Sequence, residues 1–332
     1  MNRTSAGAIL GRFADKRILV VGDLMLDEFV WGKVSRISPE APVPVVNVTA
    51  ESYYPGGAAN VARNVREFTA ATAVLGAVGA DAAGGRLIEL LRASGIDTSG
   101  VLQEPQLSTA VKTRIIARNQ QVVRVDRERP TALSAEQRAR VLEQCQSAIR
   151  TVDAIVVADY GKGFVTQELA DFLCRAAREH GKVLAVDPHP HTSLGWRGAT
   201  AVKPNRLEAF LAAGMAPSDP VEPALADRAL LEAGRRLLER WQPRCLLVTL
   251  GEQGMLLFQP DALPHHIPAC ARDVFDVSGA GDTAIGVFAL ALSSGASPVE
   301  AAALANHASG IVVGKLGTAT AHRGELEASF PE

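Results

Sequence analysis

Short continuous apolar runs alternate with longer mixed stretches along most of this chain. Four of the runs occupy residues 17–23, 153–159, 183–187 and 244–251, and each ends in an acid or a glycine. Runs of this length are typical of strands buried on both faces of a parallel sheet, with helices in between. We therefore predict an α/β fold with a mainly parallel central sheet, in which ligands bind beyond the carboxyl ends of the strands.

The mixed stretches have the composition of helices that cover such a sheet. Ser134 is followed three residues later by Gln137, the spacing of a capping box, and this pair predicts the start of one helix. The predicted helices include those near residues 82–94, 134–150, 166–180 and 283–292, one that ends near residue 241, and one at 298–313, which we expect to be the final helix of the chain.

Two segments interrupt this alternation. Prolines block a helix between residues 28 and 55, and the valines there favour extended chain. Residues 108–126 predict a second pair of extended stretches. We expect one domain spanning residues 1–332, with these segments forming a small, antiparallel inserted sheet that projects as a lid over a site. Its apolar face would pair with a second copy of the chain, which predicts a homodimer.

The composition excludes several classes of protein. Of the 332 residues, 47% are hydrophobic and 21% charged, and the net charge is −2, so neither nucleic acid nor a membrane surface is an expected partner. No apolar stretch reaches 18 residues and the N-terminus lacks the layout of a signal peptide. Four cysteines, Cys145, Cys174, Cys245 and Cys270, form no C-x-x-C pair, so we expect buried thiols in a reducing cytoplasm.

The strongest candidate chemistry lies in residues 276–287 (DVSGAGDTAIGV), where Asp282 follows Gly279, Ala280 and Gly281. Glycines allow close backbone approach, and the N–H groups at a helix start form a ready anion site, usually for phosphate. A carboxylate beside such a site could take a proton from an attacking hydroxyl. Asp282 could equally cap the helix, and the sequence leaves both interpretations open.

Further candidates follow the predicted strands. Asp23 and Asp27 lie where a polyhydroxy substrate could be held, and Asp187 ends a third strand in the same way. Lys162 stands between two glycines and could meet a phosphate as a point charge. Solvation of loops by these side chains is the alternative.

Two short polar motifs complete the candidate site. Gly57 precedes a helix that carries Asn60 and Asn64 four residues apart, which suits hydroxyl recognition or an exposed face. Asn205 and Glu208 have capping-box spacing, but they could also organise Mg²⁺ and its waters beside nucleotide phosphates.

Competing motifs are absent from the sequence. It contains no G-x-x-x-x-G-K-[ST] loop, no complete G-x-G-x-x-G fingerprint, no H-E-x-x-H and no G-x-S-x-G. These absences disfavour a P-loop enzyme, a dehydrogenase, a zinc protease of that type and a serine hydrolase.

Two stretches together resemble the signatures of the ribokinase (PfkB) carbohydrate kinase family. They are residues 56–64 (GGAANVARN) and 276–282 (DVSGAGD); residues 203–208 (KPNRLE) also resemble the N-x-x-E element of that family, and 248–254 (VTLGEQG) its nucleotide-side strand and turn. The resemblance implies a ribokinase-like three-layer α/β sandwich with a β lid, using ATP and Mg²⁺, and often a homodimer joined by its lids.

The resemblance also implies roles for individual residues. Asp282 would be the base, and the N–H groups around Gly279, Ala280 and Gly281 would hold the transferred phosphoryl group. Glu208 and Asn205 would hold Mg²⁺ through water. The implied sugar side comprises Asp23, Asp27, Gly57, Asn60, Asn64, Arg118, Lys162 and Asp187, and the implied nucleotide side Asn205, Glu208, Thr249, Gly251, Ser278 and Asn306.

Within that family, residues 22–27, 35–45, 159–163 and 275–283 resemble a subgroup of lipopolysaccharide-core synthesis. That subgroup phosphorylates the anomeric hydroxyl of D-glycero-β-D-manno-heptose 7-phosphate to the 1,7-bisphosphate. Lys162 and a lid arginine such as Arg118 would then receive the 7-phosphate. Because members often carry a fused adenylyltransferase and this chain ends at Glu332, we expect the stand-alone kinase type, with adenylyl transfer by another protein.

One departure and three alternatives remain. His189 stands where the subgroup is expected to have a lysine, so a cation role at that position is in doubt. The alternatives are a kinase for another sugar, such as ribose or fructose 1-phosphate, a dehydrogenase on a similar sheet, and a non-catalytic sugar-binding regulator. Asp282, Glu208 and both glycine stretches argue against the regulator.

Overall fold

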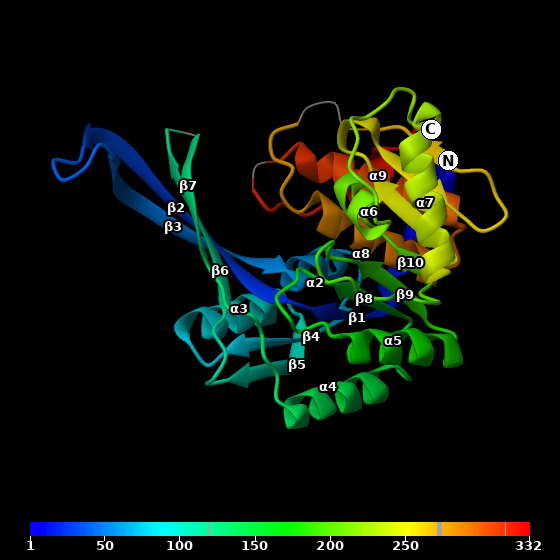
Figure 1. The fold of residues 1–332 in the computed structure, drawn as a ribbon, viewed down its shortest axis with the longest axis horizontal. Coiled ribbons are helices and arrows are strands. Elements are labelled where there is room, and N and C mark those ends of the chain that lie inside the picture. The colour runs from blue at the N-terminus through cyan, green and yellow to red at the C-terminus, as the bar shows by residue number, and fades with distance from the viewer. Residues whose placement is uncertain (119, 271–273, 316) are drawn as a thin grey trace.

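The computed structural model describes residues 1–118, 120–270, 274–315 and 317–332 (Figure 1). Within these ranges nine strands form one sheet in the order β13-β12-β11-β10-β9-β8-β1-β4-β5, parallel from β5 to β11 and antiparallel from there to β13. The strands are β1 (Arg17–Gly22), β4 (Ala71–Gly79), β5 (Asp97–Glu104), β8 (Ala154–Ala158), β9 (Val183–Asp187), β10 (Ala201–Val202), β11 (Cys245–Thr249), β12 (Met255–Phe258) and β13 (His265–Ile267).

Helices cover both faces of this sheet and complete three layers (Figure 1). One apolar cluster joins the sheet to α1 (Arg3–Leu10), α2 (Ala58–Arg66), α3 (Ala82–Ala93), α8 (Ala280–Ser293), α9 (Pro298–Val313) and α10 (Arg323–Ala328). The cluster on the other face includes α4 (Ala135–Ala148), α5 (Gln167–Glu179), α6 (Arg206–Ala212) and α7 (Arg228–Trp241). Three short 3₁₀ turns are η1 (Phe13–Asp15), η2 (Ala224–Ala226) and η3 (Gly251–Gln253). The predicted α/β architecture with a mainly parallel central sheet is confirmed.

The inserted sheet, called the lid below, consists of β2 (Leu24–Ile37), β3 (Pro44–Gly57), β6 (Ala110–Ala117) and β7 (Gln120–Arg127) in the order β3-β2-β6-β7. Figure 1 shows it projecting from the main sheet. Its two hairpins are antiparallel, as predicted, but β2 and β6 pair in parallel. The reason is topological: β2 continues outward from β1, and β6 comes after β5, so both leave the parallel sheet in one direction.

Some local predictions need correction. The helix at 298–313 is not the last, because α10 follows it, and α1 at the N-terminus was not predicted. Both are short, and they pack near each other, with the Arg3 N–H donating to the Pro331 carbonyl at 2.7 Å. Three cysteines are buried as expected, whereas Cys270 is exposed. Across the described ranges, no helix combines the length and apolar character needed to cross a bilayer.

Candidate active site

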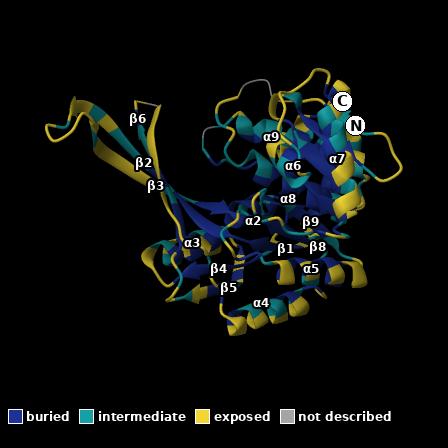
Figure 2. Ribbon diagram, viewed as in Figure 1, coloured by how far each residue is buried: buried dark blue, intermediate teal, exposed yellow. Residues whose placement is uncertain are grey.

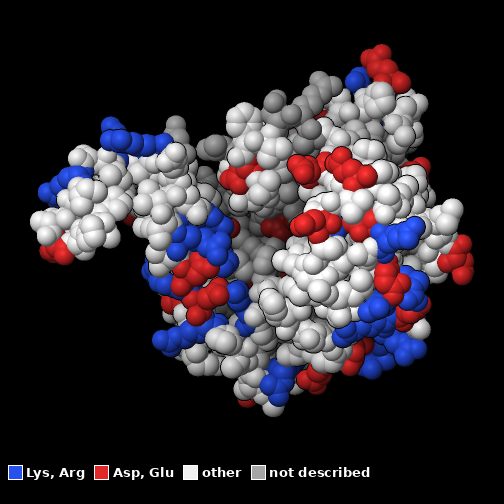
Figure 3. Space-filling model, turned by 45° about the horizontal axis from the view of Figure 1, so that its top comes forward, with Lys and Arg blue, Asp and Glu red and all other residues white. Residues whose placement is uncertain are grey.

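A cleft of about 880 Å³ lies between the lid and the carboxyl ends of β1, β8, β9 and β11. Figure 3 shows the surface hollowed there, with acidic side chains inside. The position agrees with the expectation that ligands bind beyond the carboxyl ends of parallel strands. Of the predicted residues, the cleft is lined by Asp27, Gly57, Asn60, Asp187, Asn205, Glu208, Thr249, Gly251, Ser278, Gly279, Gly281 and Asp282.

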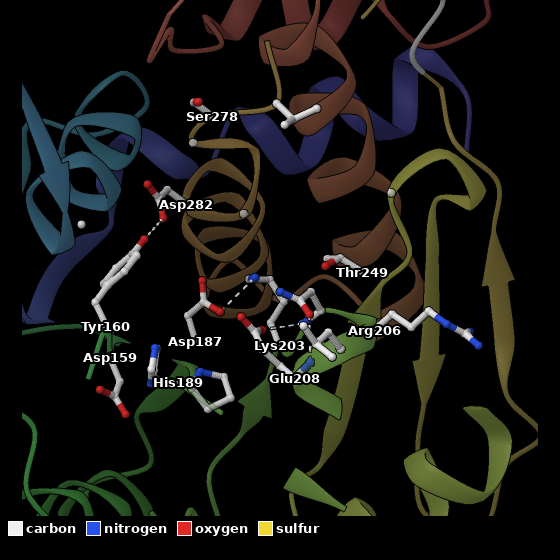
Figure 4. A pocket seen from close by; sticks show the side chains of 18 of the residues that line it. Asp159, Tyr160, Asp187, His189, Lys203, Arg206, Glu208, Thr249, Ser278 and Asp282 are labelled. Atoms are coloured by element: carbon white, nitrogen blue, oxygen red, sulfur yellow. Dashed lines mark hydrogen bonds and ion pairs between the residues drawn. The ribbon is translucent and has the colours of Figure 1, made fainter. Parts of the chain in front are cut away.

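Asp282 lies in the first turn of α8, with its carboxylate on the wall of this cleft (Figure 4). Gly279 is the N-cap residue, and the Asp282 side chain makes no capping hydrogen bond. Instead, the Tyr160 hydroxyl donates to Oδ1 and the Asn60 amide donates to Oδ2 at 2.6 Å. The capping interpretation is therefore wrong, and the carboxylate is held by residues from two other elements.

Burial raises the pKa of Asp282 to about 6, with the nearby Asp187 acting in the same direction. The hydrogen bonds from Tyr160 and Asn60 and the Lys203 cation limit this rise. The group is thus mainly ionised at neutral pH, yet much more basic than an exposed aspartate, which is the range that suits a general base.

The start of α8 offers backbone N–H groups to an anion, since the first turn of a helix leaves them without internal partners. Gly279 has φ = 81°, and a Cβ there would lie 2.8 Å from the Asn60 amide nitrogen, so this turn requires glycine. A Cβ on Gly281 would lie 3.5 Å from Lys203 Nζ. An ammonium and a helix N-terminus therefore converge beside Asp282, which makes the predicted anion site more cationic than the glycines alone indicated.

Lys203 was missed as a site residue, although it belongs to the quoted motif at 203–208. It is buried in the floor of the cleft and forms an ion pair with Asp187 at 3.0 Å (Figure 4). Aligned with the N-x-x-E element, the lysine could have been singled out as a buried charge two residues before Asn205.

Asn205 and Glu208 form the predicted capping box at the start of α6. Asn205 Oδ1 accepts from the Glu208 N–H at 2.9 Å, and Glu208 Oε2 accepts from the Asn205 N–H at 2.7 Å. The capping box uses Glu208 Oε2, so Oε1 remains available to a ligand. Burial, together with the charge of Asp187, raises the pKa of Glu208 to about 7. The oxygen donors of Glu208 and Asp187 suit Mg²⁺ with its waters and phosphate oxygens. In the described ranges, no three His, Cys, Asp or Glu side chains converge to hold a metal directly.

A second cavity of about 530 Å³ adjoins the cleft, and Thr249, Gly251 and Gly281 line both. Its walls are largely apolar and include Met255, Ala269, Val277, Ala280 and Val313, a setting that suits a flat aromatic base. The predicted Asn306 also lines it and holds its wall, donating to the Pro268 carbonyl at 2.7 Å and to Cys270 Sγ at 3.1 Å.

Four predicted sugar-side residues do not line the cleft. Asp23 is buried behind it and accepts from the N–H groups of residues 160, 162 and 164. Asn64 lies behind Asn60, donating to its carbonyl at 2.9 Å. Lys162 pairs with Glu128 at 2.8 Å, and Arg118, at the turn of the lid hairpin, donates to the Val34 carbonyl at 3.0 Å. All four side chains therefore lie outside the lining that a molecule in the cleft would touch.

Residues 15–323 match the family model described as pfkB family carbohydrate kinase. The chain belongs to the pfkB family of carbohydrate kinases. Membership confirms the predicted ATP-dependent carbohydrate kinase and excludes the dehydrogenase alternative.

Curated relatives and solved structures agree with the family. The chain is 44% identical to the bifunctional protein HldE of Desulfatibacillum aliphaticivorans over 96% of its own length and 64% of the relative. It is 42% identical to that of Geotalea uraniireducens over 99% of its own length and 66% of the relative, so it spans about two thirds of these relatives.

Among solved structures, phosphofructokinase-2 of Escherichia coli superposes with a TM-score of 0.73 at 20% identity, covering 94% of this chain and 97% of that one. The ribokinase of Arabidopsis thaliana gives a TM-score of 0.69 at 18% identity, with 96% of each chain covered. These likenesses confirm the ribokinase-like fold.

The cleft also contains three cationic side chains of the lid that the sequence did not predict as site residues. Lys112, Arg114 and Arg124 line the cavity, and Arg114 pairs with Asp27 at 2.6 Å. They were missed because alternating charges on a strand also mark an ordinary solvated face. The pairing of β6 with β2 turns Lys112 and Arg114 toward the cavity, whereas Arg118 comes after the end of β6.

His189 also lines the cleft, at the position where a lysine was expected (Figure 4). Burial lowers the pKa of its imidazole, and Nδ1 is buried without a hydrogen-bond partner among the described residues. A neutral ring at pH 7 does not supply the cation of a lysine.

Proposed function

We propose that this chain transfers the γ-phosphoryl group of ATP to the anomeric hydroxyl of D-glycero-β-D-manno-heptose 7-phosphate. The products are the 1,7-bisphosphate and ADP. The observation that carries the proposal is that one cleft contains both a buried carboxylate of raised pKa, Asp282, and three cations on the lid. The likeness of residues 22–27 and 35–45 to the heptose 7-phosphate subgroup supports the choice of sugar.

In the proposed reaction, Asp282 accepts the proton of the C1 hydroxyl while its oxygen attacks the γ-phosphorus. The bond between that phosphorus and the oxygen bridging to the β-phosphate breaks, and ADP leaves. The N–H groups at the start of α8 and the Lys203 ammonium hold the negative charge on the moving phosphoryl group. Mg²⁺, bound with the nucleotide near Glu208, would neutralise phosphate charge.

We assign binding of the substrate's 7-phosphate to Lys112, Arg114 and Arg124 rather than to Arg118 and Lys162. All three line the cleft, whereas Arg118 and Lys162 do not. Lys112 and Arg124 pair with Asp126, and Arg114 pairs with Asp27, so the guanidinium of Arg114 is pre-organised for a phosphomonoester. A kinase for free sugars does not need these three cations, so their presence in the cleft favours a phosphorylated substrate.

A substrate panel in a coupled ADP-release assay tests the proposal. We expect turnover of heptose 7-phosphate and no turnover of unphosphorylated heptose, with the product identified by phosphorus NMR. Preference for another sugar phosphate, such as fructose 1-phosphate, would support the alternative kinase. Absence of ADP release with every sugar would support the non-catalytic regulator.

Two variants test the assigned roles. Asp282→Asn should fold normally and turn over at least about 100-fold more slowly, the contribution of a positioned base. Arg114→Gln should raise the KM for the sugar phosphate about 10- to 100-fold, as expected for a lost charged hydrogen bond, with little change in the KM for ATP. Arg118→Gln, on the same hairpin but outside the cleft, is the matched control and should behave as wild type.

We also propose a homodimer joined through the lids and a cytoplasmic location. Val122, Val123 and Val125 on β7 and Val48 on β3 are exposed. The outer part of the lid is largely exposed (Figure 2), and we expect a second copy to cover apolar side chains there. The free cysteines fit a reducing compartment. Sedimentation at micromolar protein tests the dimer, since the mass of one subunit would contradict it.

A further inference from the structure

We propose that Tyr160 is a positioning residue for the base, and that the buried Asp23 fixes Tyr160 in place. The inference rests on the proposed role of Asp282 as the base. It gives a function to Tyr160, which contacts Asp282, and to Asp23, which contacts the backbone of Tyr160. Neither residue takes part in the phosphoryl-transfer step itself.

The Asp282 carboxylate is clamped by one donor on each oxygen. The Tyr160 hydroxyl donates to Oδ1, and Asn60 Nδ2 donates to Oδ2 at 2.6 Å. Figure 4 shows the Tyr160 ring extending from the loop after β8 to the start of α8. With both oxygens held from opposite elements, the carboxylate keeps one orientation toward the cleft, which is what a general base requires.

Tyr160 is in turn held through its own backbone. Its N–H donates to Asp23 Oδ2 at 2.8 Å, the Lys162 N–H donates to the same oxygen at 3.1 Å, and the Phe164 N–H donates to Oδ1 at 3.1 Å. The loop therefore curls around one carboxylate that is 2% exposed. Gly161 and Gly163 adopt positive φ angles of 67° and 98°, which this tight path requires.

Asp159 supports the same loop from its other side. Its Oδ1 accepts from the Gly161 N–H at 2.8 Å, and its Oδ2 accepts from the Thr192 hydroxyl at 2.7 Å. Two acids at the ends of neighbouring strands thus shape one loop, whose first residue reaches the base. Asp23, whose position at a strand end suggested substrate binding, and Asp159 thus both support the placement of Tyr160.

The clamp has a direct consequence for the base. A donor to a carboxylate stabilises its charged form, so loss of the Tyr160 hydroxyl should make Asp282 more basic and keep it protonated to higher pH. The hydroxyl itself keeps its proton, because burial raises the pKa of Tyr160 well above its usual value.

The test is the pH profile of kcat/KM for Tyr160→Phe, with Tyr53→Phe as the matched control. Tyr53 lies on β3 outside the cleft, where its hydroxyl donates to Glu51 at 2.8 Å. We expect the acid limb of Tyr160→Phe to move upward by about one pH unit, as for one lost charged hydrogen bond. Activity would fall about fivefold at pH 6, because about one half of the wild-type carboxyl and about one tenth of the variant's is ionised there, and it would approach wild type at pH 8.5. An unmoved limb, or an equal loss at every pH, would overturn the proposal.

A variant of native volume guards against misfolding. The chain has three tyrosines, and 3-fluorotyrosine lowers the phenol pKa, which strengthens its donation. In the enzyme that contains 3-fluorotyrosine, the acid limb of the kcat/KM profile should lie at lower pH. An unchanged acid limb would contradict the clamp. Asp23→Asn should move it upward, and combining it with Tyr160→Phe should add little, because both act through one hydroxyl.

A measurement without turnover separates this inference from the proposed function. A carbon-13 NMR titration of the Asp282 carboxyl should show its pKa rising in Tyr160→Phe. If that rise occurs while Asp282→Asn keeps full activity, the clamp stands and the base assignment fails. If Asp282→Asn is inactive but the titration is unchanged in Tyr160→Phe, the base stands and the clamp is wrong.

Discussion

Lys203 Nζ lies 3.0 Å from Asp187 Oδ1 in the floor of the cleft, with 3% and 15% of the two side chains exposed. The pair joins the end of β9 to the segment that leads into α6, and it places a cation beside the start of α8. We therefore expect the pair to have two separable roles, in stability and in phosphoryl transfer.

Lys203→Met should lower both stability and activity. Removing one partner of a buried ion pair leaves an uncompensated charge and costs about 3–5 kcal/mol of unfolding free energy. Lys203→Met combined with Asp187→Asn should regain most of the stability but none of the activity. Urea unfolding and kcat measured on both variants check this, and recovery of activity in the double variant would contradict the role at the phosphoryl group.

Asp282 should make the protein less stable as pH rises. Its pKa is about 6 when folded and its ordinary value is 3.8, so between these values the folded state binds more protons than the unfolded state. The unfolding free energy therefore falls as pH rises from about 4 to about 6, by on the order of 2–3 kcal/mol. Asp282→Asn lacks this titrating carboxyl, so its unfolding free energy should rise relative to that of wild type as pH increases over that window. Urea unfolding of both proteins from pH 4 to 7 measures the difference, and a constant difference would show that the carboxyl titrates normally.

Magnesium use should depend on the titration of Glu208. The pKa of this carboxyl is raised to about 7, chiefly by burial, so protons compete with the metal below neutrality. We expect the apparent affinity for Mg²⁺, with ATP saturating, to weaken as pH falls from 8 to 6. Glu208→Gln should weaken it at all pH values and remove that pH dependence. Glu252→Gln, at the rim of the adjoining cavity, serves as the control.

Cys270 offers a test of the nucleotide site that does not use turnover. It is exposed and lines the apolar cavity, whereas Cys145, Cys174 and Cys245 are buried. Burial raises the pKa of the Cys270 thiol, so alkylation should be measured at pH 9. ATP should slow modification of Cys270 at least about fivefold, in proportion to occupancy of the site. Mass spectrometry measures the rate of alkylation at each cysteine. Equal rates at Cys270 with and without ATP would show that the adenine ring binds outside this cavity.

The sequence by itself determined the mainly parallel α/β architecture and predicted Asp282 as a candidate base. Continuous apolar runs can be satisfied only by burial on both faces, so the parallel sheet followed from residues such as those of β8 and β9. The segment around Gly279 and Asp282 predicted an anion site, because a glycine turn into a helix exposes unpaired N–H groups. The extended lid segment at 28–55 also followed from its prolines and valines, although the parallel pairing of β2 with β6 did not.

Only the tertiary structure decided which polar side chains reach the cleft. Asp23 and Asp27 are both buried and four residues apart, yet one holds a loop and the other faces the lid cations. Tyr160 meets Asp282 across 122 residues, and Arg114 enters the cleft while Arg118 does not. The physical reason is that hydrogen-bond partners come from chain segments remote in sequence, so a local pattern fixes a residue's element but not its neighbours.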